Sequence, residues 1–299
     1  MMKPDNTKME RRQFLKTASE QMLGVTFAAA GLETVANAIG YNEGPDDLDH
    51  YDFLMPRVKY AHQKKEVDRW NVRPGGDANL LRELSAVIRC KVKPIKGVRD
   101  WDPQWAAEGQ LNAIVTFDEP EEVMKYPFLF MTGENHFTFD DSQKENLKQY
   151  LLRGGFLLMD DCVVDTGGDF FYQSSFALLE DVFGRGTVQR IPREHEVFHN
   201  VYDLGDSGLP HMEYTQPQMP NFPWMIRPPR MPKTNPLPVM QGQNHGARGV
   251  FIGERLAVFL SSTDIHCGWC DSHGFTFGRH NYKKAIQMGI NIIMYALTH

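Results

Sequence analysis

Residues 126–161 read YPFLFMTGENHFTFDDSQKENLKQYLLRGGFLLMDD, and this stretch decides the predicted fold. The run 128–132 is apolar without helical spacing and ends at Gly133, which is typical of a strand buried on both faces. A second apolar run covers 156–159, and a segment with helical spacing separates the two. The order strand, helix, strand predicts a β-α-β unit with parallel strands and a right-handed crossover.

The helix inside this unit has recognisable ends. Asp140 and Gln143 have the spacing of a capping box at its start. The glycine pair 154–155 ends it, because glycine enters the left-handed conformation freely. The residues predicted to share its buried face are Leu147, Tyr150 and Leu151.

Polar residues follow both predicted strands, at the edge where ligands bind in parallel sheets. Further candidates come from later segments that also follow predicted strands. The predicted cleft comprises Glu134, Asn135, His136, Asp160, Asp161, His195 and Asp264. Because adjacent strand residues point to opposite faces, we do not expect Asp160 and Asp161 to act as a simple carboxylate pair.

Four blocks of the sequence carry a resemblance to a known family. They are residues 126–137, 150–161, EHEVFH at 194–199 and GERLAVFLSSTDIHCGW at 253–269. Together they resemble domain of unknown function 4159, from about residue 53 to the C-terminus. The resemblance implies an α/β fold with the flavodoxin-like core of class I glutamine amidotransferases, and it implies no activity.

Glutamine hydrolysis itself is disfavoured by the residues around Cys162. Amidotransferases of this type place the nucleophilic cysteine in a Gly-x-Cys-x-Gly turn, whereas Asp161 and Val163 flank Cys162. Neighbouring carboxylates also raise the pKa of a thiol, which opposes its activation.

Composition and the N-terminus limit the classes of function. The chain has 299 residues, is 41% hydrophobic and carries a net charge of −6, with no basic patch, so we expect no nucleic-acid partner. Arg11 and Arg12 lie in a segment that resembles a twin-arginine export signal spanning 1–38, followed by a linker at 39–52. The sequence therefore predicts an exported, periplasmic protein without a membrane span, in which 53–299 forms one domain.

The remaining elements are predicted from periodicity and turn residues. Predicted strands lie at 53–60, 90–95, 188–191, 249–252 and 255–262, the last two forming a hairpin. Predicted helices lie at 77–88, 174–183 and 283–297, and 264–280 is predicted to be a loop. Residues 203–248 are rich in proline and methionine and predict an irregular insertion that acts as a lid or a partner-binding arm.

The cysteines permit either metal binding or a disulfide. Cys267, Cys270 and His273 form a C-x-x-C-x-x-H pattern that can supply ligands to zinc or iron. An oxidising compartment favours a disulfide instead, and Cys162 can pair with either later cysteine if the loop after Asp264 folds over the cleft. Other histidines in this set are His199, His266 and His280.

Three functions follow from these residues. The first is a non-catalytic binding domain that takes a small polar or carbohydrate-like ligand in the cleft, or a protein partner through 203–248. The second is a metal-dependent hydrolase of envelope material, using His136, Asp160, Asp161 and His195. The third is a metal-binding accessory protein, with the ligand set of the C-x-x-C-x-x-H pattern.

Overall fold

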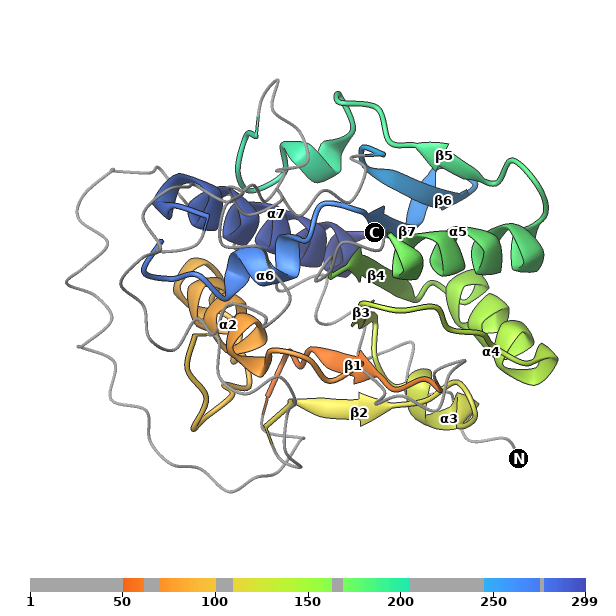
Figure 1. The fold of residues 1–299 in the computed structure, drawn as a ribbon, viewed down its shortest axis with the longest axis horizontal. Coiled ribbons are helices and arrows are strands. Elements are labelled where there is room, and N and C mark those ends of the chain that lie inside the picture. Colours follow the sequence, from red (N-terminus) through yellow and green to blue (C-terminus); the bar gives the residue numbers. More distant parts are fainter. Residues whose placement is uncertain (1–50, 62–69, 101–109, 163–168, 205–244, 275–276) are drawn as a thin grey trace, which may run out of the picture.

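A computed structural model describes residues 51–61, 70–100, 110–162, 169–204, 245–274 and 277–299 (Figure 1). The predicted export signal, residues 39–50 of the predicted linker at 39–52 and most of the insertion predicted at 203–248 lie outside these residues. Within the described ranges, no helix combines the length and apolar character needed to cross a membrane.

The described residues form an α/β fold built on a seven-stranded sheet with the order β2-β1-β3-β4-β7-β6-β5. The five strands from β2 to β7 run parallel, whereas β6 and β5 are antiparallel to their neighbours. This mainly parallel sheet is consistent with the predicted flavodoxin-like class. The strands are β1 (Pro56–Val58), β2 (Ala113–Val115), β3 (Phe128–Gly133), β4 (Phe156–Asp161), β5 (Val188–Arg190), β6 (Arg248–Ile252) and β7 (Arg255–Ser261).

The predicted β-α-β unit is confirmed at the centre of this sheet. Strands β3 and β4 are parallel, with Phe128 paired to Phe156, and every residue of both strands is buried. Helix α4 (Asp141–Leu152) connects them and begins with the predicted capping box of Asp140 and Gln143. The left-handed Gly154, with a φ of 98°, follows the end of α4.

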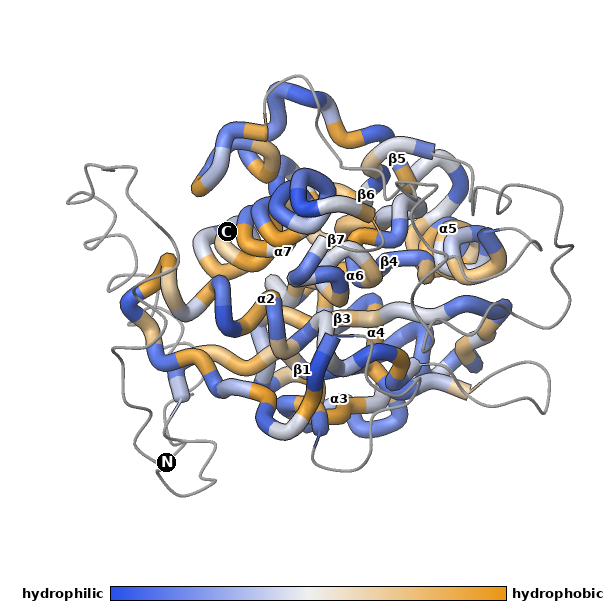
Figure 2. The backbone as a smooth tube through the Cα atoms, turned by 60° about the vertical axis from the view of Figure 1, so that its left-hand side comes forward, coloured by the Kyte–Doolittle hydropathy of each residue, from blue (hydrophilic) through white to orange (hydrophobic). Residues whose placement is uncertain are grey.

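Helices cover both faces of the sheet. On one face, α2 (Pro74–Val87), α6 (Ile265–Trp269) and α7 (Arg279–Thr298) pack on the even-numbered residues of β4. On the other face, α3 (Pro120–Val123), α4 and α5 (Phe170–Phe183) pack on its odd-numbered residues. Figure 1 shows the two groups of helices on either side of the strands, and hydrophobic residues recur along α7 (orange in Figure 2).

The hairpin of β6 and β7 is confirmed as antiparallel, with Gly253 in the left-handed conformation at its turn. Two predicted helices begin earlier than expected, α5 at Phe170 and α7 at Arg279. The predicted strand at 90–95 is instead a single bridge between Phe53 and Val92.

Two further differences lie next to the candidate site. Helix α2 begins at Pro74 rather than at Asp77, because proline at the first helical position lacks only an N–H that would have no helical partner. The predicted loop at 264–280 contains the short helix α6. Its first amides are capped by a side chain from another strand, which periodicity within the loop does not reveal.

Candidate metal centre

The two adjacent carboxylates at the end of β4 point to opposite faces of the sheet, as strand geometry predicts. Asp160 accepts hydrogen bonds from the amides of Ile265 and His266, at 3.3 and 2.8 Å, on the face that carries α6. Asp161 accepts one from the amide of Tyr172, at 2.9 Å, on the face that carries α5. Asp160 therefore binds the start of α6 on one face of the sheet, and Asp161 binds the start of α5 on the other.

Asp160 determines where α6 begins. Asp264 occupies the N-cap position of α6 without making a side-chain cap, and Asp160 takes that role from β4. The Asp264 carboxylate is thereby left to face the sulfurs of its neighbours, and its Oδ1 has no hydrogen-bond partner among the described residues. A buried oxygen acceptor without a donor is costly, which marks it as a candidate ligand.

Cys162, Asp264 and Cys267 form a compact group of metal-ligand type. Their ligand atoms all lie within 4.8 Å of one another, and all three residues are buried. The sulfurs of Cys162 and Cys267 are 3.3 Å apart, although the residues are 105 positions apart in the chain. The group lies at the carboxyl ends of β4 and β7, which are parallel neighbours and so end at the same edge of the sheet.

Burial holds the acids of this group in their protonated forms when no cation is present. The hydrogen bond with Cys267, together with burial, raises the pKa of Cys162 well above its ordinary value. The same bond acts to lower the pKa of Cys267, but burial and Asp264 outweigh it and raise that pKa to about 12. Burial also raises the pKa of Asp264 well above its ordinary value. A cation would therefore displace protons on binding.

Arg73 supplies a positive charge beside this group. Burial acts to lower its pKa, but Cys267, Cys162, Cys270 and Asp264 together outweigh that effect and raise it. Arg73 is also the N-cap of α2 and has a left-handed φ of 48°. The guanidinium therefore enters the site from the start of a helix that packs on the same face as α6.

A buried network of Arg57, Asp77 and His266 fixes α6 to the rest of this face. Arg57 donates to both carboxylate oxygens of Asp77, at 2.8 and 2.6 Å, and all three side chains are fully buried. The Nε2 of His266 lies 3.1 Å from Asp77 Oδ1 and 2.9 Å from Arg57 Nη2. Burial and the charge of Arg57 lower the pKa of His266 to about 4, so the imidazole is neutral at physiological pH.

The predicted C-x-x-C-x-x-H ligand set is only partly brought together. Cys267 belongs to the group above, whereas the sulfur of Cys270 packs against the first turn of α2, 3.9 Å from the carbonyl oxygen of Arg73. His273 is exposed and lies outside the group. The structure places Cys162 and Asp264, rather than Cys270 and His273, beside Cys267.

The predicted cleft is divided by the sheet. Glu134 and Asn135 follow β3 and are partly buried. His136 lies on the α5 face, where its Nδ1 is 3.0 Å from Ser174 Oγ, whereas Asp160 and Asp264 lie on the α6 face. The expectation of one shared cleft is therefore not met.

His195 is remote from all of these residues, which corrects its assignment to the site. Strand β5 ends at the carboxyl edge of the sheet, as expected. The segment that follows it then runs back over the face of the sheet that carries α7. The His195 ring lies 5.6 Å from Phe251 and 5.2 Å from Tyr295, whose hydroxyl accepts from the amide of Leu256. Leu256 is at the amino end of β7, so His195 lies toward the opposite edge of the sheet.

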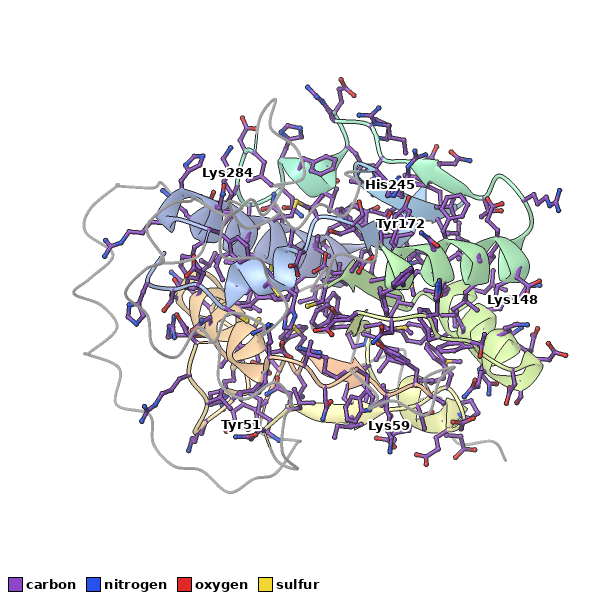
Figure 3. The ribbon with its side chains drawn as sticks, in the orientation of Figure 1. Tyr51, Lys59, Lys148, Tyr172, His245 and Lys284 are labelled. Carbon is purple, nitrogen blue, oxygen red and sulfur yellow. The ribbon has the colours of Figure 1, made fainter. Side chains whose placement is uncertain are left out.

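A histidine and carboxylate pair on the α5 face was not predicted. His245 Nε2 contacts Asp169 Oδ2, and the His245 ring stacks on the Tyr172 ring with centroids 4.3 Å apart. Figure 3 labels both His245 and Tyr172. His245 is adjacent to 205–244, and no local motif in the sequence marks it. Arg57 and Asp77 were likewise missed, since their pairing depends on contact between β1 and α2.

The backbone at Cys162 also agrees with the sequence argument against amidotransferase chemistry. The non-glycine residues with positive φ in the described ranges are Arg73 and Asp264, so Cys162 does not occupy the strained turn of a nucleophile elbow. Its thiol is fully buried and has a raised pKa, whereas the cysteine nucleophile of an amidotransferase needs a lowered one.

Comparison with known proteins identifies the family of this chain. A search of curated proteins found no significant match. The sequence model of a family described as a domain of unknown function matches residues 55–297, which covers every strand and helix of the described fold except the last residue of α7. The chain therefore belongs to the DUF4159 family.

Proposed function

We propose that this protein is an exported metal-binding accessory protein that holds a divalent thiophilic cation, zinc or iron(II), between Cys162, Asp264 and Cys267. The observation that carries the proposal is the convergence of two sulfurs and one carboxylate within 4.8 Å in a buried site. Export is supported by the resemblance of the segment around Arg11 and Arg12 to a twin-arginine signal.

The donor atoms favour a borderline or soft transition metal. Thiolates bind zinc and iron strongly, whereas calcium and magnesium prefer sites made wholly of oxygen. Two cysteines and one carboxylate provide three ligands, which leaves one tetrahedral position for a small exogenous ligand. The two cysteines therefore argue against calcium or magnesium as the bound cation.

Charge balance supports a divalent rather than a monovalent ion. Two thiolates and one carboxylate carry three negative charges, and Arg73 together with a divalent cation carries three positive charges. Neutrality matters because an uncompensated charge in a buried site is costly. A monovalent ion would leave the group with a net negative charge.

The other two predicted functions have less support from the geometry. The hydrolase required His136, Asp160, Asp161 and His195 to act together, but these residues are divided between the faces and edges of the sheet. A carbohydrate-like ligand or a protein partner stays a prediction, since no described contact bears on it.

Metal analysis of the purified full-length protein tests the proposal. The protein would be loaded with zinc, desalted and analysed by mass spectrometry of the bound metal. We expect stoichiometric zinc in the wild type and its loss in Cys162→Ser, Cys267→Ser and Asp264→Asn, with folding checked by circular dichroism. Cys90→Ser is the matched control, because Cys90 lies outside the group. Equal zinc in the wild type and the two cysteine variants, or none in the wild type, would contradict the proposal.

A further inference from the structure

The two sulfurs of the candidate metal centre are close enough to react with one another. Cys162 Sγ and Cys267 Sγ are 3.3 Å apart and are not bonded in the structure. A disulfide requires about 2.05 Å between sulfurs, so they must approach by about 1.3 Å. Two thiolates on one tetrahedral zinc, each at about 2.3 Å from the metal, would be about 3.8 Å apart. The observed separation of the two sulfurs lies between the disulfide distance and the zinc-bound distance.

The third buried cysteine is excluded as the partner. Cys270 is at the end of α6, and its sulfur lies 3.9 Å from the carbonyl oxygen of Arg73. It also limits the space beside Gly76, where an added Cβ would be 3.0 Å from that sulfur. Cys270 thus packs against α2, whereas Cys267 faces Cys162.

We propose that Cys162 and Cys267 form a disulfide when the metal is absent, so that a metal-bound dithiolate and a metal-free disulfide are alternative states of one site. The metal-bound state rests on the function proposed above. The two states exclude one another because a disulfide carries no negative charge and has lost both thiolate ligands. The pair would therefore make metal retention depend on oxidation.

The oxidation needs a two-electron acceptor, and we take a hydroperoxide as its chemical class. One thiol is oxidised to a sulfenic acid as the O–O bond breaks, and the product of the peroxide is an alcohol or, from hydrogen peroxide, water. The second thiol then attacks the sulfenic sulfur, forms the S–S bond and releases water. In sum, two thiols and one hydrogen peroxide give one disulfide and two waters.

The fold allows the small movement that this reaction requires. Cys267 lies on α6, a helix of five residues, while Cys162 directly follows the rigid central strand β4. Asp264 precedes α6 in a left-handed conformation and connects it to β7. The approach of the two sulfurs requires rotation of the cysteine side chains about their Cα–Cβ bonds, which leaves α6 held by Asp160 and Asp77.

The test compares metal-free and zinc-loaded full-length protein after treatment with hydrogen peroxide. Thiols are counted by alkylation in denaturant followed by intact mass, and the linked peptides are then identified after digestion. The chain has four cysteines. We expect four free thiols before treatment, two after treatment without zinc, and four when zinc is bound. Only the peptides that contain Cys162 and Cys267 should be joined.

The variants and outcomes separate this inference from the proposed function. Cys270→Ser and Cys90→Ser should still form the bond, whereas Cys162→Ser and Cys267→Ser should not. A bond through Cys270 or Cys90, or no loss of thiols, would overturn the inference. So would the same bond forming at an equal rate in protein shown to hold stoichiometric zinc, and in that case the metal function stands. If the bond forms but zinc never binds, the proposed function and the metal-bound state both fail.

Discussion

Arg73 and Asp264 are the two non-glycine residues of the described chain with a left-handed backbone, with φ of 48° and 58°, and both border the same cysteines. Each conformation costs about 1–3 kcal/mol relative to the common regions and persists only when the surroundings enforce it. Arg73 begins α2 and Asp264 begins α6. The coincidence of two strained residues with three buried cysteines marks this end of the sheet as a functional site.

The scaffold of this site depends on the ion pair between Arg57 and Asp77, both fully buried. Asp77→Asn should lower the free energy of unfolding by about 3–5 kcal/mol at neutral pH, because it leaves the buried Arg57 guanidinium without a counter-charge. Urea unfolding followed by tryptophan fluorescence would measure this. The exposed Asp141 provides the matched control, and Asp141→Asn should have no measurable effect. An equally stable Asp77→Asn variant would show that the pair does not hold α2 to β1.

The same pair predicts a specific pH dependence. Burial alone would raise the pKa of Asp77, but Arg57 and His266 outweigh it and hold the pKa below its ordinary value of 3.8. A carboxyl with a lowered pKa stabilises the fold above its unfolded pKa and loses that contribution as pH falls through the folded value. The stability difference between wild type and Asp77→Asn should therefore be constant at neutral pH and shrink below about pH 4.

Asp160 and Asp161 should have separable roles although they are adjacent. Asp160→Ala removes the acceptor for the amides of Ile265 and His266 and frees α6, so zinc affinity should fall about 10–100-fold. Asp160→Asn keeps an acceptor oxygen and should retain most of the affinity. Asp161→Ala acts on the α5 face and should leave affinity unchanged. Competition with a chromophoric chelator measures all three, and equal losses in the two alanine variants would refute the division between faces.

The central strand provides a test of the core. Leu158 is fully buried in β4, and Leu158→Ala should lower the free energy of unfolding by about 2–5 kcal/mol. Leu152, at the end of α4, is 49% exposed and gives a matched control with the same change in side-chain volume. Thermal or urea unfolding would compare them. A Leu158→Ala variant no less stable than Leu152→Ala would contradict the observed packing of β4.

Export is tested in cells. Replacing Arg11 and Arg12 together by lysine should leave the protein in the cytoplasm with its N-terminus uncut, because the twin-arginine pathway requires the arginine pair. Lys8→Arg changes a basic residue of the same segment and should not affect export. Fractionation and N-terminal mass analysis provide the measurement. Normal export of the double lysine variant would refute the predicted route.

Local sequence signals were sufficient for the central unit and insufficient for the site. The apolar runs, the capping box at Asp140 and the left-handed Gly154 are encoded within a few residues, and all were recognised. The alternation of side chains along β4 also predicted that Asp160 and Asp161 lie on opposite faces of the sheet. Extended by two positions, the same alternation puts Cys162 on the face of Asp160, and the structure confirms the predicted approach of Cys162 to a cysteine of the loop after Asp264.

The missing parts of the site depend on contacts between distant segments. Arg57 bonds Asp77, which is 20 positions away, and Asp77 contacts His266, which is 189 positions away, so no local pattern reveals the network. His195 was misplaced for a similar reason. It follows a strand, but the segment after that strand returns across the α7 face and leaves the carboxyl edge. Residues that follow parallel strands lie together only when the chain remains at the carboxyl edge of the sheet.

The most direct test of the proposed metal centre is X-ray absorption spectroscopy at the metal edge of the zinc-loaded full-length protein. We expect two sulfur neighbours at about 2.3 Å and a shell of oxygen at about 2.0–2.2 Å. The two sulfurs belong to Cys162 and Cys267, so Cys90→Ser should keep both, while Cys162→Ser and Cys267→Ser should hold no zinc with a two-sulfur shell. A spectrum of zinc surrounded only by oxygen and nitrogen, or a two-sulfur shell unchanged in both serine variants, would show that Cys162 and Cys267 do not hold the metal.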